Sequence, residues 1–402
     1  PPAHAHASAL TLECVTFANE PTREHEMTDT LGRRLSELLS DAEDVPRSRR
    51  DFLARASALG TVIPLAGAVL TGCETTPRQK SVEQHDTGTT ARQSPNADSK
   101  LDTAHGGARH SMTPTAAELA QAAPYHRYDP TLPPLSSRRT LTLEWTAQEV
   151  PLRIRDDTVV AAWTFTGDIP GPIVHCRVGD TVEFTLTNKG TLPHSMDFHA
   201  AQIDPTTAFR STPPGQSVSY SFKPRHAGAF LYHCGTSPVL MHLGSGMFGA
   251  IIVSPATPLA PAKEFVLVHS EYYLGQPVSG VQPCDYNKML ATLPDYVVFN
   301  GRPSQYQSDP IRVHVGDRVR FHVVNAGPTH PCGFHVVGEQ FDTVYLGAPP
   351  ASAIHGVQTF GVCAGGGMIF ELVADVPGTF PFVNHGFGHG QKGAIGALVV
   401  ES

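Results

Sequence analysis

The part of the chain after Thr140 contains an internal repeat, which restricts the fold more strongly than any other feature. The tripeptide Val-Gly-Asp occurs at 178–180 and again at 315–317, each time directly before a segment in which apolar and polar residues alternate. Each copy also closes on a similar apolar segment that begins with Gly-Ala, at 249–253 and at 396–400. A pattern repeated at this spacing indicates two domains of the same fold, joined in tandem.

Alternating segments predict β-strands, because successive side chains of a strand point to opposite faces of a sheet. The segments 181–187 and 318–324 have this character, and turn residues separate the expected strands. The chain also contains 36 glycines and 35 prolines, which is typical of short strands joined by turns. We therefore predict an all-β fold of two Greek-key β-sandwiches. An immunoglobulin-like sandwich without metal would show the same pattern, so the spacing of metal ligands must decide between the two.

Four segments are expected along the chain. Residues 1–73 form a leader, 74–136 a disordered linker, 137–256 the first sandwich and 257–402 the second. The linker is rich in Thr, Gln, Ser, Asp and Pro and poor in large apolar residues. It therefore cannot bury enough surface to fold by itself, and we expect it to act as a tether.

The leader resembles a bacterial export signal. Arg49 and Arg50 precede an apolar run at 56–70, which is too short and too interrupted to span a bilayer but suits a signal peptide. The arginine pair resembles a twin-arginine motif, and the residues up to Cys73 resemble a lipobox, whose cysteine is acylated. This resemblance implies a periplasmic or otherwise extracytoplasmic protein, held at the membrane surface by a lipid anchor at Cys73. A plain cleaved signal with a chance cysteine is the alternative.

The charge of the chain argues against a polyanionic partner. The formal net charge is −8 and no basic stripe is interleaved with aromatic residues, so nucleic acid is not expected as a partner. The 21 histidines are more informative, since histidine is the commonest metal ligand among side chains. The positions of these histidines in the sequence show which of them could bind a metal ion together.

One short loop carries three side chains that suit copper: Cys234, His242 and Met247. A blue-copper, or type 1, site needs one thiolate, two imidazoles and a weak axial thioether. His194, in an earlier segment, supplies the second imidazole. Each of these residues alone has an ordinary explanation, such as a buried thiol or a core methionine. Their combination at this spacing predicts a type 1 copper site, and hence cupredoxin-like sandwiches.

Two further histidines, His199 and His233, are expected to bind a second metal ion. His233 directly precedes Cys234, and neighbours in an extended strand face opposite sides, so the two side chains cannot bind the same metal. A catalytic site of three imidazoles with an open position needs one more histidine. His385 is the candidate, because its segment of the second copy aligns with the segment that carries His233.

The segment 191–200 strongly resembles the segment of copper-containing nitrite reductases that carries a type 1 histidine, a catalytic aspartate and a type 2 histidine. This resemblance, which extends over both sandwiches, implies a type 1 copper at His194, Cys234, His242 and Met247 and a type 2 copper at His199, His233 and His385, two copper ions per chain. It implies that Asp197 and His335 supply protons and that Val337 shapes the substrate pocket. It also implies a homotrimer in which His385 comes from the neighbouring subunit.

The expected reaction is the one-electron reduction of nitrite to nitric oxide and water, with the electron passed from type 1 to type 2 copper. A cupredoxin or a cytochrome c is the expected electron donor. Two alternatives remain. A laccase-like two-domain multicopper oxidase needs paired His-x-His motifs and a His-Cys-His triplet, whereas Cys234 is followed here by Gly235. A non-catalytic type 1 copper electron carrier would have no use for His199, His233 and His385.

Overall fold

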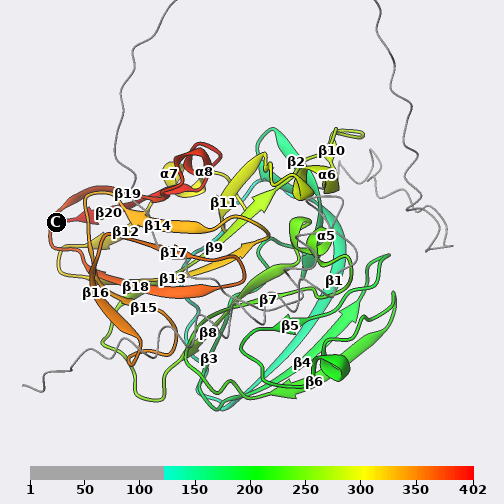
Figure 1. Cartoon of the computed structure of the whole chain (residues 1–402), viewed down its shortest axis with the longest axis horizontal. Coiled ribbons are helices and arrows are strands. Elements are labelled where there is room, and N and C mark those ends of the chain that lie inside the picture. Colours follow the sequence, from blue (N-terminus) through cyan, green and yellow to red (C-terminus); the bar gives the residue numbers. More distant parts are fainter. Residues whose placement is uncertain (1–121) are drawn as a thin grey trace, which may run out of the picture. The chain divides into compact units, whose positions relative to one another are not determined.

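The computed structural model describes residues 122–402, which form two β-sandwiches (Figure 1). The twin-arginine pair, the lipobox cysteine and most of the expected tether lie outside these described residues. No helix in the described part of the chain is both long and apolar enough to cross a membrane.

The first sandwich pairs a five-stranded sheet, ordered β10-β2-β1-β4-β6, with a four-stranded sheet, ordered β3-β8-β7-β5. Two short helices lie in its connections. The elements are β1 (Thr140–Arg155), β2 (Thr158–Phe165), β3 (Val174–Arg177), β4 (Thr181–Asn188), β5 (Asp197–Phe198), α4 (Pro205–Ala208), β6 (Ser217–Phe222), β7 (Gly228–His233), α5 (Val239–Gly244), β8 (Phe248–Ser254) and β10 (Val281–Gln282).

The second sandwich pairs a six-stranded sheet, ordered β11-β9-β13-β18-β15-β16, with a five-stranded sheet, ordered β12-β20-β19-β14-β17. Its elements are β9 (Lys263–Tyr272), α6 (Tyr286–Leu290), β11 (Tyr296–Phe299), α7 (Gln305–Ser308), β12 (Ile311–His314), β13 (Arg318–Gly327), β14 (Cys332–Val336), β15 (Phe341–Tyr345), β16 (Ala353–Val357), β17 (Thr359–Val362), β18 (Gly367–Val373), β19 (Gly378–Asn384), α8 (Phe387–Gln391) and β20 (Ile395–Glu401). The prediction of an all-β fold with two sandwiches is confirmed.

The first sandwich closes around aromatic side chains. On β4, the alternate residues Val182, Phe184 and Leu186 are buried, as the alternating sequence predicts. They share one cluster with Trp145, whose ring meets that of Phe184 edge-on with centroids 5.5 Å apart. Strand β7 lies in the facing sheet, so the packing of this core also fixes the strand that leads into Cys234.

Strand β13 is buried on both faces. Val319, Phe321 and Val323 belong to the core of the second sandwich, whereas Val324 and Ala326 belong to a cluster that includes side chains of β7 and β8. This shared cluster removes apolar surface of both sandwiches from water, which is the main favourable contribution to their association.

The expected linker is wrong at its C-terminal end, because residues 122–136 pack against the sandwiches. The backbone N–H of Tyr128 donates to Gln305 Oε1 over 2.8 Å, and the hydroxyl of Tyr306 donates to the carbonyl of Tyr128 over 3.0 Å. The polar composition of this segment hides these bonds, since most of them use backbone groups and partners that are distant in the chain.

The strand registers correct the alignment of the second copy. The backbone N–H of Cys234 donates to the carbonyl of Met247, and that of Asn384 donates to the carbonyl of Ala394, both over 3.0 Å. The pairs of the flanking strands agree with this equivalence. Asn384 therefore takes the place of Cys234, and His385 lies one residue beyond it rather than in the place of His233. Similar residue types in the two copies hide this shift, because they carry no information about which strand positions pair.

Candidate metal centres

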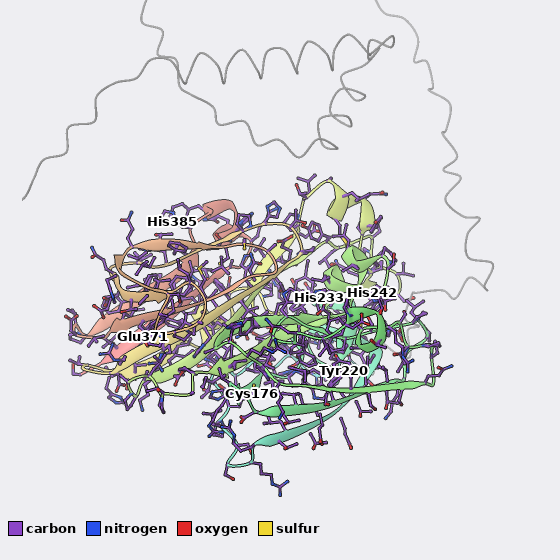
Figure 2. The ribbon with its side chains drawn as sticks, turned by 60° about the horizontal axis from the view of Figure 1, so that its bottom comes forward. Cys176, Tyr220, His233, His242, Glu371 and His385 are labelled. Atoms are coloured by element: carbon purple, nitrogen blue, oxygen red, sulfur yellow. The ribbon has the colours of Figure 1, made fainter. Side chains whose placement is uncertain are left out.

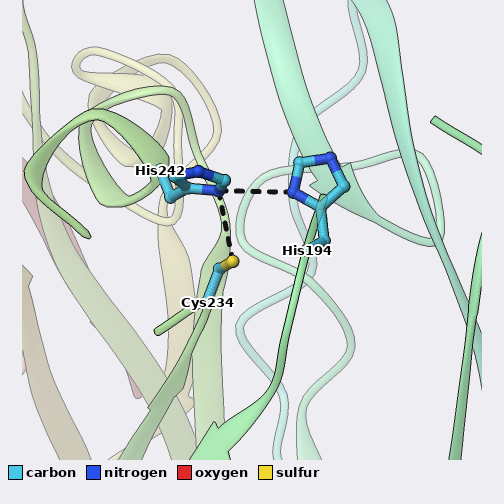
Figure 3. A group of neighbouring side chains, drawn as sticks. All are labelled: His194, Cys234 and His242. Atoms are coloured by element: carbon cyan, nitrogen blue, oxygen red, sulfur yellow. Dashed lines mark hydrogen bonds between the residues drawn. The ribbon is translucent and has the colours of Figure 1, made fainter. Parts of the chain in front are cut away.

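A buried set of donor atoms lies at one end of the first sandwich, formed by His194, Cys234 and His242 (Figure 3). The Sγ atom of Cys234 lies 3.2 Å from Nδ1 of His242, and Nδ1 of His194 lies 3.3 Å from the same atom. Cys234 directly follows β7, His242 lies on α5, and His194 precedes β5. The structure thus brings together three of the four expected type 1 ligands, with their donor atoms facing one another.

The surroundings of Cys234 favour its thiolate. Burial by itself would raise the pKa of the thiol, but hydrogen bonds with His194 and His242 and from the backbone N–H of Ser195 outweigh burial and hold this pKa well below its usual value. Burial likewise opposes the charged form of His194, yet its contacts with Cys234 and Glu149 raise its pKa. The thiolate is the form of cysteine that binds metal, so this set is electrostatically prepared for a cation.

Met247, the fourth expected ligand, is fully buried beside this set. Its backbone N–H donates to the carbonyl of His242 over 3.1 Å, and its carbonyl accepts from Cys234 over 3.0 Å. Trp163 encloses the set from another side, with ring centroids 4.8 Å from His242 and 5.9 Å from His194. The buried set is therefore closed to water by apolar and aromatic side chains.

A second, more exposed set contains Asp197, His199 and His233. The Nε2 atoms of the two histidines lie 3.1 Å apart, and Asp197 Oδ2 lies 3.9 Å from His233 Nε2. The Nδ1 atom of His199 donates to the carbonyl of Gly365 over 3.2 Å, and that of His233 donates to the carbonyl of Cys234 over 2.9 Å. These bonds leave both Nε2 lone pairs directed at the same space, as metal ligands require.

The two sets lie on opposite sides of one strand end. His233 is the last residue of β7 and Cys234 follows it directly, so the alternation of side chains directs the imidazole toward His199 and the thiol toward His242. One peptide unit therefore joins the buried set to the exposed set.

The remaining expected site residues belong to the second sandwich. His335 and His385 lie side by side, with ring centroids 5.3 Å apart, and Val337 is exposed. Figure 2 shows His385 well apart from His233, and the described residues of the single chain do not bring it into the exposed set. In the described part of the chain, the pair of His335 and His385 is thus separate from the pair of His199 and His233.

Asp197 and His335 occupy the same strand position in the two sandwiches. Asp197 pairs with His233 across β5 and β7, and His335 pairs with Val383 across β14 and β19, where Val383 is the counterpart of His233. The Nδ1 atom of His335 lies 2.6 Å from the carbonyl of Gln358 and donates to it. Its Nε2 atom is therefore the one that remains for proton exchange.

The place of Cys234 in the second sandwich holds an amide network instead of a thiolate. Asn384 Oδ1 accepts from the backbone N–H of Gly333 over 3.2 Å, just as Cys234 Sγ accepts from Ser195. Its Nδ2 atom contacts His269 Nε2 at 3.1 Å and His389 Nδ1 at 3.0 Å. His389 also packs on His330, with ring centroids 4.7 Å apart. In the second sandwich an amide therefore stands at the strand position that carries the thiol in the first.

Sequence reasoning missed the residues that orient the ligands, namely Glu149, Trp163 and Gly365. Only strand pairing or a loop from the other sandwich brings them to the sites, and no local motif marks them. The five cysteines in the described part of the chain are all free thiols.

Comparisons with known proteins agree with this geometry. The multicopper oxidase family model matches residues 146–258. A copper-containing nitrite reductase of Neisseria meningitidis serogroup A is 39% identical over 261 residues, which cover 63% of this chain and 67% of the relative. A copper-containing nitrite reductase of Cereibacter sphaeroides is 30% identical, over 63% of this chain and 74% of the relative. This chain thus spans about two thirds of the length of the Neisseria relative.

Solved structures give the same result. The copper nitrite reductase from Nitrosomonas europaea superposes with a TM-score of 0.61 at 34% identity, over 65% of this chain and 94% of that chain. A crystal structure of a multicopper oxidase superposes with a TM-score of 0.58 at 28% identity, over 65% of this chain and 89% of that chain. The predicted pair of cupredoxin-like sandwiches is confirmed by these similarities. The chain belongs to the copper-containing nitrite reductase family.

Proposed function

We propose that this chain reduces nitrite to nitric oxide with two copper ions, one in the buried set and one in the exposed set. The observation that carries this proposal is the adjacency of His233 and Cys234, which joins a closed thiolate-containing set to an open imidazole set through one peptide unit. The named relatives and the solved copper nitrite reductase support the same reaction.

The donor atoms of the buried set fit a type 1 copper. One thiolate and two imidazoles suit a metal that cycles between a softer and a harder oxidation state, and we assign the weak axial thioether to Met247, which is buried beside them. Because the set is closed and its members are held by packing, little rearrangement is needed when an electron is taken up. His194, Cys234, His242 and Met247 are therefore the proposed type 1 ligands.

The exposed set fits a type 2 copper that keeps a position for substrate. His199 and His233 offer two neutral imidazoles, and a third is needed. We propose that His385 of a neighbouring subunit supplies it, because His385 and His335 are exposed or half-buried in the single chain and lie away from the exposed set. A homotrimer with sites at its subunit interfaces follows from this assignment.

With copper in both sets, the buried set supplies the electron and the exposed set supplies the Lewis acid for nitrite. Reduction of nitrite to nitric oxide and water consumes one electron and two protons. Asp197, half-buried beside His233, and His335, with its Nε2 atom available, are the proposed proton donors. The exposed Val337 is the proposed apolar wall of the nitrite pocket.

We also propose a route of export and an electron donor for this protein. Export by the twin-arginine route and a lipid anchor at Cys73 would place the protein at an extracytoplasmic membrane surface. A cupredoxin or a cytochrome c in that compartment would be the electron donor.

The test is nitric oxide release from nitrite by the copper-loaded protein with an artificial electron donor. We expect release, together with two copper ions per chain. One copper per chain would favour the electron carrier, and four would favour the multicopper oxidase. If both coppers are present and no nitric oxide forms, the proposed reaction is wrong.

A further inference from the structure

A carboxylate lies behind the buried set. Glu149 is on β1, directly across from Trp163 on β2, and its Oε1 atom lies 3.4 Å from Nε2 of His194. His194 is fully buried, whereas the carboxyl side chain is 26% exposed. One nitrogen of the imidazole thus faces the carboxylate and the other faces Cys234 and His242.

The carboxylate of Glu149 is held in a fixed position. The backbone N–H of Thr191 donates to both of its oxygens, over 3.1 and 2.9 Å. Gly190 makes room for it, because a Cβ atom there would lie 2.7 Å from Glu149 Oε1. The N–H of Gly190 donates in turn to Asn188 Oδ1 over 2.9 Å, which fixes the turn. The turn that precedes His194 is therefore built around this carboxylate.

This arrangement has two consequences for His194. The Nε2–H group donates to the carboxylate, so the lone pair is kept on Nδ1, the atom that faces Cys234 Sγ and His242 Nδ1. A carboxylate that accepts from a metal-bound imidazole also makes the imidazole more basic and places a negative charge near the metal. Both effects stabilise the more highly charged oxidised copper relative to the reduced copper.

We propose that Glu149 is a positioning residue that fixes the orientation of His194 and lowers the reduction potential of the type 1 copper. This inference rests on the proposed type 1 site. The hydrogen bonds of the Glu149 carboxylate are to Thr191 and His194 and not to the exposed set, so its effect reaches the reaction through the potential at which the electron is supplied.

The test is a redox titration of the copper-loaded protein, followed by the thiolate-to-copper visible absorption. Glu149→Gln keeps the size of the side chain and a hydrogen-bond acceptor but removes the charge. Because the neutral amide no longer favours the more highly charged oxidised copper, we expect a shift of about tenfold toward reduced copper, which is ~59 mV for one electron. Glu144→Gln, an exposed residue of the same strand, is the matched control and should leave the potential unchanged.

Equal potentials in the Glu149→Gln variant and the Glu144→Gln control would overturn the inference while leaving the proposed site intact. If Glu149→Gln loses the visible absorption, its potential cannot be measured, and the Glu149→Asp variant then tests whether a charged carboxylate is needed. A Glu149→Asp variant that keeps both the absorption and the wild-type potential supports the need for a charged carboxylate. Loss of absorption to the same extent in Glu149→Gln and Glu149→Asp overturns the inference, because the charge of the carboxylate then has no separate effect. Wild-type protein that binds copper without this absorption would instead refute the proposed type 1 site.

Discussion

Arg302 holds the two sandwiches and the N-terminal segment together through a buried guanidinium. It is fully buried, and it donates to the carbonyl of Ile169 over 2.6 Å and to Asp168 Oδ1 over 2.7 Å. His126 Nε2 lies 3.0 Å from the same guanidinium. Its Nε atom has no partner, which offsets part of this gain. Arg302→Met keeps most of the side-chain volume and removes these bonds.

Hydrogen bonds of charged groups contribute about 1.5–3 kcal/mol each, and an unpaired buried donor costs about 1–3 kcal/mol. Two such bonds less one unpaired donor give an expected loss of about 2–3 kcal/mol in the free energy of unfolding. For a folded part of this size, that lowers Tm by roughly 3–5 °C. Thermal unfolding followed by circular dichroism, at one protein concentration and with the copper content matched, measures the change.

Arg312→Met is the matched control, because Arg312 makes an exposed ion pair with Glu401 at 2.8 Å and is 57% exposed. Exposed pairs contribute only about 0–1 kcal/mol, so this variant should lower Tm by no more than about 2 °C. Equal Tm shifts in Arg302→Met and Arg312→Met would show that burial does not set the contribution of these two arginines.

Three further predictions concern the sites. Cys234→Ala should abolish the intense visible absorption while copper stays in the exposed set, because the thiolate belongs only to the buried set; retained colour would place the type 1 copper elsewhere. Activity should require the proposed trimer, in which His385 of a neighbouring subunit completes the exposed set, and a fully active monomer seen by sedimentation would rule this out. Asp197→Asn and His335→Ala should each keep both coppers but lose most nitrite turnover, and the double variant should be little worse than the worse single one. Wild-type turnover by His335→Ala would leave Asp197 as the proton donor by itself.

The donor sets could be predicted from the sequence because their geometry is mostly local. Cys234 and His233 are neighbours, and a strand must direct them to opposite sides. His242 and Met247 lie in one short loop after that strand, so few conformations could keep them away from the thiol. The repeat likewise predicted two sandwiches, since turns and alternating segments recur in the same order.

The second copy shows where this reasoning fails. Strand pairing decides which residue takes the place of Cys234, because Tyr232 pairs with Gly249 and Phe382 pairs with Gly396. Similar residue types in the two copies do not show which positions pair. The structure puts Asn384 there, with His385 one residue further on. A shift of one residue turns a side chain to the other face of a sheet, so a small error in alignment changes which residues can meet.

The sequence by itself predicted the all-β repeat, the grouping of His194 and His242 with Cys234, and the division of the two donor sets between the faces of one strand. Only the tertiary structure decided what surrounds them. Glu149 reaches His194 because β1 passes behind it, and the carbonyl of Gly365 reaches His199 from the second sandwich. Residues 122–136 are held by backbone bonds to β9 of the second sandwich and by side-chain bonds to the first, such as that from the Tyr128 hydroxyl to the carbonyl of Gly171. Contacts of this kind join segments far apart in the chain, and they form only once the packing of both cores has offset the entropy of closing the intervening loops.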